Sequence, residues 1–145
     1  MKKIHIIGLG LLGGSFGLAA AKKFPDISIT GSDADEKNLQ DALNLGIIQE
    51  AKDAPDADTD IVILATPADT LNELLLKTLD QAGENTLVFD VGSTKAKLCA
   101  LVADHPKRKH YLAAHPIAGT EYSGPKAAFG DLLDRKVMII CELEQ

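Results

Sequence analysis

His115 is the side chain in this sequence best suited to move a proton. It follows the apolar run 111–114 and precedes Pro116, which places it at the carboxyl end of a predicted strand. An imidazole has an ordinary pKa near 6.5, so at neutral pH it can accept a proton or a hydrogen bond. The same position suits a structural histidine whose ring is bound by backbone groups, and the residues alone leave both interpretations open.

A second polar cluster, Asp90-Val91-Gly92-Ser93-Thr94-Lys95, ends another apolar run. The hydroxyls of Ser93 and Thr94 are available to a ligand at this point. Alternatively, they cap the helix that the sequence predicts from Lys95 onward, because Ser and Thr are preferred at helix N-termini. The spacing favours neither reading decisively.

The hexapeptide Gly8-Leu9-Gly10-Leu11-Leu12-Gly13 has the pattern G-x-G-x-x-G. It follows a predicted strand and opens a predicted helix, a context typical of dinucleotide-binding loops. Gly8 permits the tight turn, Gly10 lets the backbone approach a pyrophosphate, and Gly13 lets the helix pack close to the sheet. The N–H groups at the helix start, around Leu11 and Leu12, favour bound phosphates. We therefore expect this loop to bind a cofactor.

Asp33 lies 20 residues after Gly13, at the end of the second predicted strand. A carboxylate at this point accepts hydrogen bonds from the adenosine ribose and repels a 2′-phosphate, so NAD is preferred over NADP. Asp33 could also cap the helix that is predicted to begin at Asp35. At the end of a later strand, Ala65-Thr66-Pro67 leaves room for the same dinucleotide, or forms a plain structural turn.

Short apolar runs alternate with helical patterns along the chain. The runs around Ile61–Ala65 and Leu87–Val91 are apolar on successive residues, which is typical of strands buried on both faces of a parallel sheet. Strict alternation of strand and helix indicates an α/β fold with a doubly wound, mainly parallel sheet, that is, a Rossmann fold in one domain over 1–145. The predicted strands are 3–7, 27–31, 48–51, 61–65, 87–91, 111–114 and 136–141, and the predicted helices are 11–23, 35–45, 67–79 and 95–104.

Composition excludes several other functions. The net charge is -6, aromatic residues make up 4% of the chain and no basic stripe exists, so we expect no nucleic-acid partner. No run of apolar residues is long enough to span a membrane or to serve as a signal peptide, so a cytoplasmic protein is expected. Cys99 and Cys141 form no C-x-x-C pair, which favours free thiols. His105, His110 and His115 do not share a helical face, so no metal site is predicted.

Three segments together resemble the N-terminal domain of the prephenate and arogenate dehydrogenase family. They are GLGLLGGSFGLAAA at 8–21, DVGSTK at 90–95 and HPIAGTEYSGPKAA at 115–128. The first segment is shared loosely by many dehydrogenases, whereas the last two in this order are specific to the family. The resemblance extends over essentially all 145 residues but over only about the first half of a family member.

The resemblance implies roles for individual residues. His115 matches the catalytic histidine that accepts a hydrogen bond from the ring hydroxyl of the substrate, and Ser93 matches the serine at that same hydroxyl. Thr120 and Glu121 match positions at the substrate entrance. The implied reaction is the NAD-dependent oxidative decarboxylation of prephenate to 4-hydroxyphenylpyruvate in tyrosine biosynthesis, with hydride passing from the ring carbon to NAD.

Family members continue into a helical domain that forms a homodimer and supplies an arginine for the substrate carboxylates. No residue of this sequence matches that arginine, so the 145 residues are expected to bind NAD but to turn over substrate poorly. Arogenate is the alternative substrate. Two other readings are a different dehydrogenase of similar architecture, which the last two segments disfavour, and an NAD-binding module without catalysis.

Overall fold

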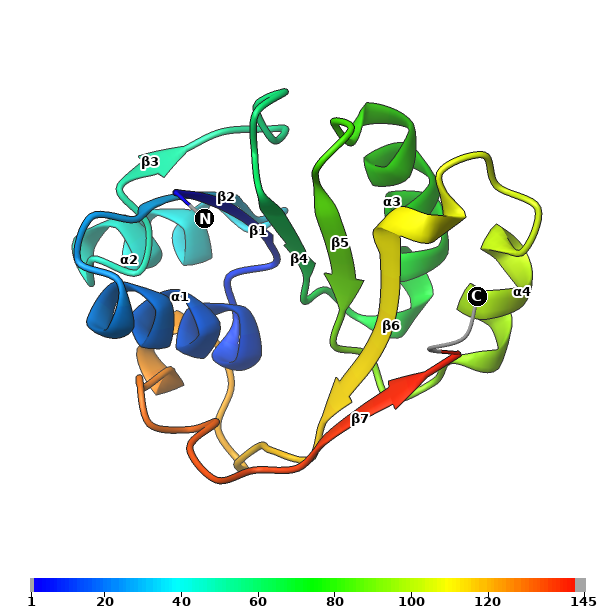
Figure 1. Ribbon diagram of the computed structural model, residues 1–145. Coiled ribbons are helices and arrows are strands. Elements are labelled where there is room, and N and C mark those ends of the chain that lie inside the picture. Colours follow the sequence, from blue (N-terminus) through cyan, green and yellow to red (C-terminus); the bar gives the residue numbers. More distant parts are fainter. Residues whose placement is uncertain (1, 143–145) are drawn as a thin grey trace.

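Seven strands form one sheet in the computed structural model, which describes residues 2–142 (Figure 1). Their order across the sheet is β3-β2-β1-β4-β5-β6-β7. The strands are β1 Lys3–Ile7, β2 Ser28–Ser32, β3 Glu50–Ala51, β4 Ile61–Leu64, β5 Leu87–Asp90, β6 Tyr111–Pro116 and β7 Met138–Cys141. The helices are α1 Leu11–Lys23, α2 Glu36–Asn44, α3 Ala68–Gln81 and α4 Ala96–Val102, with short 3-10 turns η1 Arg108–His110 and η2 Pro125–Ala127.

The sheet is parallel from β3 through β6, and β7 joins β6 in the antiparallel sense. The chain runs outward from β1 through β2 to β3, and then returns to the other side of β1 with β4. This reversal places a topological switch point between β1 and β4, because the chain leaves the carboxyl ends of these two strands in opposite directions. Ligands bind at such points in folds of this kind. The predicted doubly wound, mainly parallel sheet is confirmed.

Alternate residues of the central strands enter two different apolar layers. Ile61 and Ile63 of β4 pack with side chains of α1 and α2, whereas Val62 and Leu64 pack with side chains of α3 and α4. Figure 1 shows α1 and α2 away from α3 and α4, with the sheet between the two pairs. Burial on both faces explains why these strands are apolar on successive residues.

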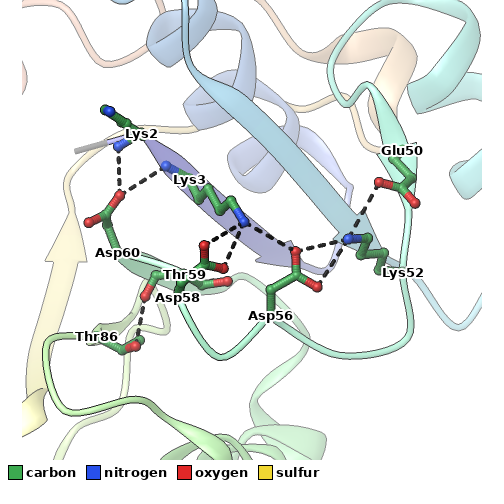
Figure 2. Close-up of polar contacts among 9 residues, drawn as sticks. All are labelled: Lys2, Lys3, Glu50, Lys52, Asp56, Asp58, Thr59, Asp60 and Thr86. Atoms are coloured by element: carbon green, nitrogen blue, oxygen red, sulfur yellow. Dashed lines mark hydrogen bonds and ion pairs between the residues drawn. The ribbon is translucent and has the colours of Figure 1, made fainter.

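Ion pairs fix the long connection between β3 and β4 against the amino ends of the strands (Figure 2). The Nζ atom of Lys3 donates to Asp58 at 2.7 Å, and Lys52 donates to Asp56 at 2.9 Å. Asp60 accepts hydrogen bonds from the backbone N–H groups of Lys2 and Lys3 at 2.6 and 2.9 Å, and these bonds lower its pKa. This edge of the sheet is opposite to the edge that carries the glycine loop.

The element boundaries differ from the predictions at a few places. The third strand is only two residues long, because only Glu50 and Ala51 pair with β2. Helix α4 begins at Ala96, with Lys95 as its N-cap and no side-chain capping bond, so the capping interpretation of Ser93 and Thr94 is wrong. Strand β6 continues through His115 to Pro116, since both residues pair with β7.

Candidate active site

The glycine loop has backbone geometry that side chains would prevent. Gly8 has a positive φ of 92°, and a Cβ there would lie 2.6 Å from the carbonyl oxygen of Ala65. A Cβ on Gly13 would lie 1.9 Å from the carbonyl oxygen of Gly8. Both glycines are therefore required for packing, as the sequence predicts.

Gly10 differs from its neighbours because it faces open space. A Cβ at this position would meet no atom within 4 Å, and Gly10 lines a large cleft. Gly10 is also the N-cap of α1, which has no side-chain capping bond and no acidic residue in its first turn. The first N–H groups of α1, those of Leu11 and Leu12 included, are thus left for an anion such as a pyrophosphate.

The large cleft has a volume of about 1100 Å³ and lies along the carboxyl ends of β1, β2 and β4. Its walls come from the glycine loop, the ends of β2 and β4, the first turns of α3 and a segment near Gly124. No lysine, arginine or histidine is among the described residues that line it, so all the charged side chains near a second phosphate on the ribose would be negative. The acidic residues of the lining are Asp33, Asp35, Asp53, Asp69 and Glu73.

Asp33 ties the end of β2 to the glycine loop. Its Oδ2 atom accepts a hydrogen bond from the backbone N–H of Leu9 at 2.7 Å, and its Oδ1 atom accepts one from Asp35 at 2.9 Å. The cap of α2 is Asp35, whose carboxylate accepts from the N–H of Lys37, so Asp33 does not cap this helix. A carboxylate has about four lone-pair sites, which leaves Asp33 able to accept from ribose hydroxyls.

Ala65, Thr66 and Pro67 also line the large cleft, at the end of β4. Pro67 is the N-cap of α3, and its carbonyl oxygen accepts a hydrogen bond from the Thr70 hydroxyl at 2.9 Å. That hydroxyl also lies 3.0 Å from the Oγ1 atom of Thr66. These three residues thus form the structural turn before α3 and also line the cleft in which a dinucleotide contact was predicted.

His115 is half-buried at the end of β6. Its Nδ1 atom lies 3.1 Å from the carbonyl oxygen of Val91. Since a carbonyl can only accept, this contact assigns the proton to Nδ1 and leaves Nε2 of the neutral ring as an acceptor. The backbone thus binds the ring, as the structural interpretation expected, and in doing so leaves one nitrogen ready to take a proton.

A small hollow of about 360 Å³ lies beside His115. It shares no lining residue with the large cleft in the described part of the chain. Its other lining residues are Pro116, Ile117, Ala118, Gly119 and Lys136. A substrate at His115 would therefore occupy a different space from the cofactor's adenosine end.

Three other predicted site residues lie outside both spaces. Ser93 is exposed in the turn after β5, and Thr120 and Glu121 are exposed in the loop after β6. The Oγ1 atom of Thr120 accepts from the N–H of Tyr122 at 3.2 Å. Within residues 2–142 no hydrogen bond joins Ser93 to His115, so the predicted roles of these three residues stay predictions.

The segment between β6 and β7 returns to the glycine-loop helix, which the sequence analysis missed. Ser123 and Gly124 line the large cleft, and the N–H of Phe129 donates to the Ser15 hydroxyl of α1 at 3.1 Å. In Figure 1 this orange segment passes next to α1, at the opposite end of the sheet from β7. The positive φ of Gly124, 80°, marks the turn, and its glycine was the only local signal.

Other sites considered in the sequence analysis are not formed by the described residues. No group of three or more His, Cys, Asp or Glu residues in this part of the chain could hold a metal ion. Cys99 and Cys141 are free, and burial raises the pKa of the Cys99 thiol. None of the helices in residues 2–142 combines the length and the apolar character that a membrane crossing needs.

Comparisons with known proteins agree on one kind of enzyme domain. The family model described as "Prephenate dehydrogenase, nucleotide-binding domain" matches residues 16–145. The prephenate dehydrogenase of Lactococcus lactis is 37% identical, over 100% of this chain and 42% of that protein. The cyclohexadienyl dehydrogenase of Zymomonas mobilis is 30% identical, over 96% of this chain and 48% of that protein.

The fold has a similar counterpart among solved structures. A crystal structure of prephenate dehydrogenase from Aquifex aeolicus, in complex with hydroxyphenyl propionate and NAD+, has a TM-score of 0.86 and 31% identity. The match covers 99% of this chain and 51% of that chain. The chain thus spans about half or less of the length of the relatives that it matches.

Proposed function

Because this chain belongs to the prephenate dehydrogenase family as its nucleotide-binding domain, we propose that the protein containing it oxidises prephenate with NAD in tyrosine biosynthesis. The product is 4-hydroxyphenylpyruvate, formed with loss of carbon dioxide. Arogenate, which differs at the side-chain end, is the alternative substrate. The observation that carries the proposal is the His115 ring, whose Nδ1 is bound to the Val91 carbonyl and which lines the small hollow.

The large cleft fits NAD in charge and shape. The open face of Gly10 and the free N–H groups of α1 suit a pyrophosphate, and Asp33 suits the ribose hydroxyls. The carboxylates of the lining disfavour the extra phosphate of NADP. When bound, NAD supplies the acceptor for the hydride that leaves the substrate ring.

His115 acts as the general base in this proposal. Its Nε2 atom accepts the proton of the substrate hydroxyl as the carbonyl forms, while the Val91 carbonyl keeps Nδ1 protonated. Ser93 binds the same hydroxyl and orients the histidine near the nicotinamide, and Thr120 and Glu121 line the substrate entrance. The protein thus contributes orientation and one well-placed base to a reaction that aromatisation drives.

The rest of the active site lies outside this chain in the proposal. A helical domain beyond residue 145 forms the homodimer and supplies the arginine that binds the substrate carboxylates. The complete protein works in the cytoplasm on a small-molecule substrate. The 145 residues alone bind NAD but turn over little substrate.

The test uses the complete protein that contains this chain. Formation of NADH or NADPH is followed with prephenate and with arogenate, each with NAD and with NADP. We expect prephenate with NAD to be oxidised fastest, and His115→Asn to remove most turnover while leaving the Kd for NAD nearly unchanged. The proposal is abandoned if neither substrate is oxidised, or if His115→Asn keeps full turnover; NAD binding without turnover would indicate a binding module instead.

A further inference from the structure

The carboxylate of Asp90 is fully buried at the carboxyl end of β5, and both of its oxygens are bound. The Oδ1 atom accepts a hydrogen bond from the Tyr111 hydroxyl of the neighbouring strand at 2.6 Å. The Oδ2 atom accepts from the N–H of Gly92 at 2.9 Å and from the Nζ atom of Lys95. One side chain therefore connects two strands and both ends of the turn that follows β5.

Lys95 is the ion-pair partner of this carboxylate, and its side chain is only 10% exposed. A buried ion pair contributes little net stability, because the cost of removing both charges from water offsets their attraction. Its main effect here is geometric: breaking it would leave a buried charge alone, so Lys95 and Asp90 stay together. The backbone between them is thereby held in one shape.

That backbone is the turn that carries Ser93. The Ser93 and Thr94 side chains are exposed and make no capping bond to α4, so they do not shape the turn themselves. A Cβ on Gly92 would lie 2.7 Å from the Cδ1 atom of Leu71 and 3.1 Å from the Oδ2 atom of Asp90, so a side chain there would require Leu71 to shift and would crowd the carboxylate. The position of Ser93 thus depends on contacts made by Asp90.

The same turn also orients His115. Its residue Val91 provides the carbonyl that accepts from Nδ1 of the histidine. Tyr111, which binds Asp90, lies on β6 four residues before His115. Burial, and then the hydrogen bond to Asp90, raises the pKa of Tyr111, so the hydroxyl remains a donor. Contacts from Asp90 therefore reach both the turn that carries Ser93 and the strand that carries His115.

On the basis of the proposed function, we infer that Asp90, paired with Lys95, is a positioning residue. It holds the Ser93 hydroxyl and the His115 ring at fixed positions relative to each other. Asp90 lines neither the large cleft nor the small hollow, so it acts through the turn and not through contact with substrate or cofactor. A displacement of about 1 Å at a reacting group can lower turnover about 100-fold. Loss of this carboxylate should therefore lower kcat without weakening the binding of NAD.

The test is Asp90→Asn in the complete protein, assayed with the substrate that the protein oxidises. The amide has the same size but cannot accept from Tyr111, Gly92 and Lys95 together. We expect kcat to fall by about 10- to 100-fold, with the Kd for NAD and its binding stoichiometry unchanged. Asp60→Asn is the control, because the Asp60 carboxylate also accepts backbone N–H bonds, those of Lys2 and Lys3, but at the opposite edge of the sheet. This control should keep kcat.

A double-mutant cycle separates positioning from a general structural effect. If Asp90 acts through the two side chains, Asp90→Asn should lower kcat much less when Ser93→Ala or His115→Asn is already present. Fully multiplicative effects in both backgrounds would overturn the inference. Should Asp90→Asn fail to fold, Tyr111→Phe and Lys95→Arg each alter one contact of the carboxylate; unchanged kcat in both would overturn it equally.

These results are distinguishable from failure of the proposed function. If the protein oxidises neither prephenate nor arogenate, or if His115→Asn keeps full kcat, the proposed function itself fails. If His115→Asn removes turnover while Asp90→Asn keeps it, only the positioning role of Asp90 fails.

Discussion

The backbone N–H of Leu9 donates to the carboxylate of Asp33 across 2.7 Å, so the glycine loop and the end of β2 are directly bonded. The residue predicted to select the ribose is therefore also bonded to the loop predicted to bind the pyrophosphate. Substitutions at Asp33 should affect both parts of the cofactor.

Asp33→Asn should reduce the preference for NAD over NADP. The amide oxygen still accepts from Leu9, but the negative charge that repels a 2′-phosphate is lost. We expect the Kd for NAD to rise about tenfold, as for the loss of one charge-assisted hydrogen bond. The ratio of NAD affinity to NADP affinity should fall by more than about tenfold, because the repulsion of the 2′-phosphate is lost as well. Titration calorimetry with both cofactors measures this. Asp58→Asn, an exposed carboxylate outside the cleft, is the control, and an unchanged ratio in Asp33→Asn would refute the assignment.

Two alanine substitutions in the glycine loop should affect different properties, one the stability of the fold and the other the binding of NAD. Gly13→Ala brings a methyl group against the Gly8 carbonyl, and should lower the free energy of unfolding by about 3 kcal/mol. Gly10→Ala places a methyl group in the large cleft. It should leave the free energy of unfolding unchanged but weaken the binding of NAD about tenfold or more. Urea unfolding and NAD titration of the two variants distinguish the effects. Equal losses of stability would contradict the open space at Gly10.

His5 should make the fold sensitive to mild acid. The ring is fully buried on β1, with Nδ1 bound to the Thr30 hydroxyl at 2.8 Å and Nε2 without a partner in the described residues. Its pKa is lowered to about 4, mainly by burial, with a smaller raising effect of Asp56 and a smaller lowering effect of Lys52. An unfolded histidine has a pKa near 6.5, so below that pH the unfolded chain binds one more proton than the folded chain.

The stability that neutral His5 contributes is therefore complete above about pH 6.5 and is lost as the pH falls to about 4. The total loss should be about 3 kcal/mol, measured by urea unfolding across this window. His5→Leu cannot titrate, and should remove the slope whatever its own stability. The carboxylates with lowered pKa, Asp56 and Asp60, act only at lower pH. A slope that persists in His5→Leu would exclude His5 as its source.

Strand β7 should promote self-association when residues 1–145 are expressed by themselves. It forms the edge of the sheet in the described residues, and Val137 and Ile139 are 66% and 46% exposed. Exposed apolar edge strands pair with other chains, whereas lysine on an edge prevents this. Val137→Lys with Ile139→Lys should raise the concentration at which light scattering begins. Leu101→Lys on α4, where Leu101 is 40% exposed, is the control and should have little effect.

The central fold follows from the sequence because its signals are local. Runs such as Ile61–Leu64 are apolar on successive residues, and the glycine spacing defines the first turn. The roles of Asp90 and Tyr111 could not be predicted, since they meet only through the register of β5 and β6. The place of His115 at the carboxyl end of a strand was predicted from the sequence, but the carbonyl that fixes its tautomer belongs to Val91, in the turn after β5.

The return of the chain from β6 to α1 was equally inaccessible to sequence reasoning. Residues 118–136 have no strong periodic pattern, and their path depends on long-range contacts such as that of Phe129 with Ser15. Only the folded chain brings Ser123 and Gly124 to the large cleft.

One short stretch of the chain after β6 contributes to the walls of both the small hollow and the large cleft. Ala118 and Gly119 line the small hollow, and Ser123 and Gly124, a few residues further on, line the large cleft. If a dinucleotide in the large cleft orders this stretch, it also orders the wall of the small hollow, and binding of either ligand should then tighten binding of the other by the same factor.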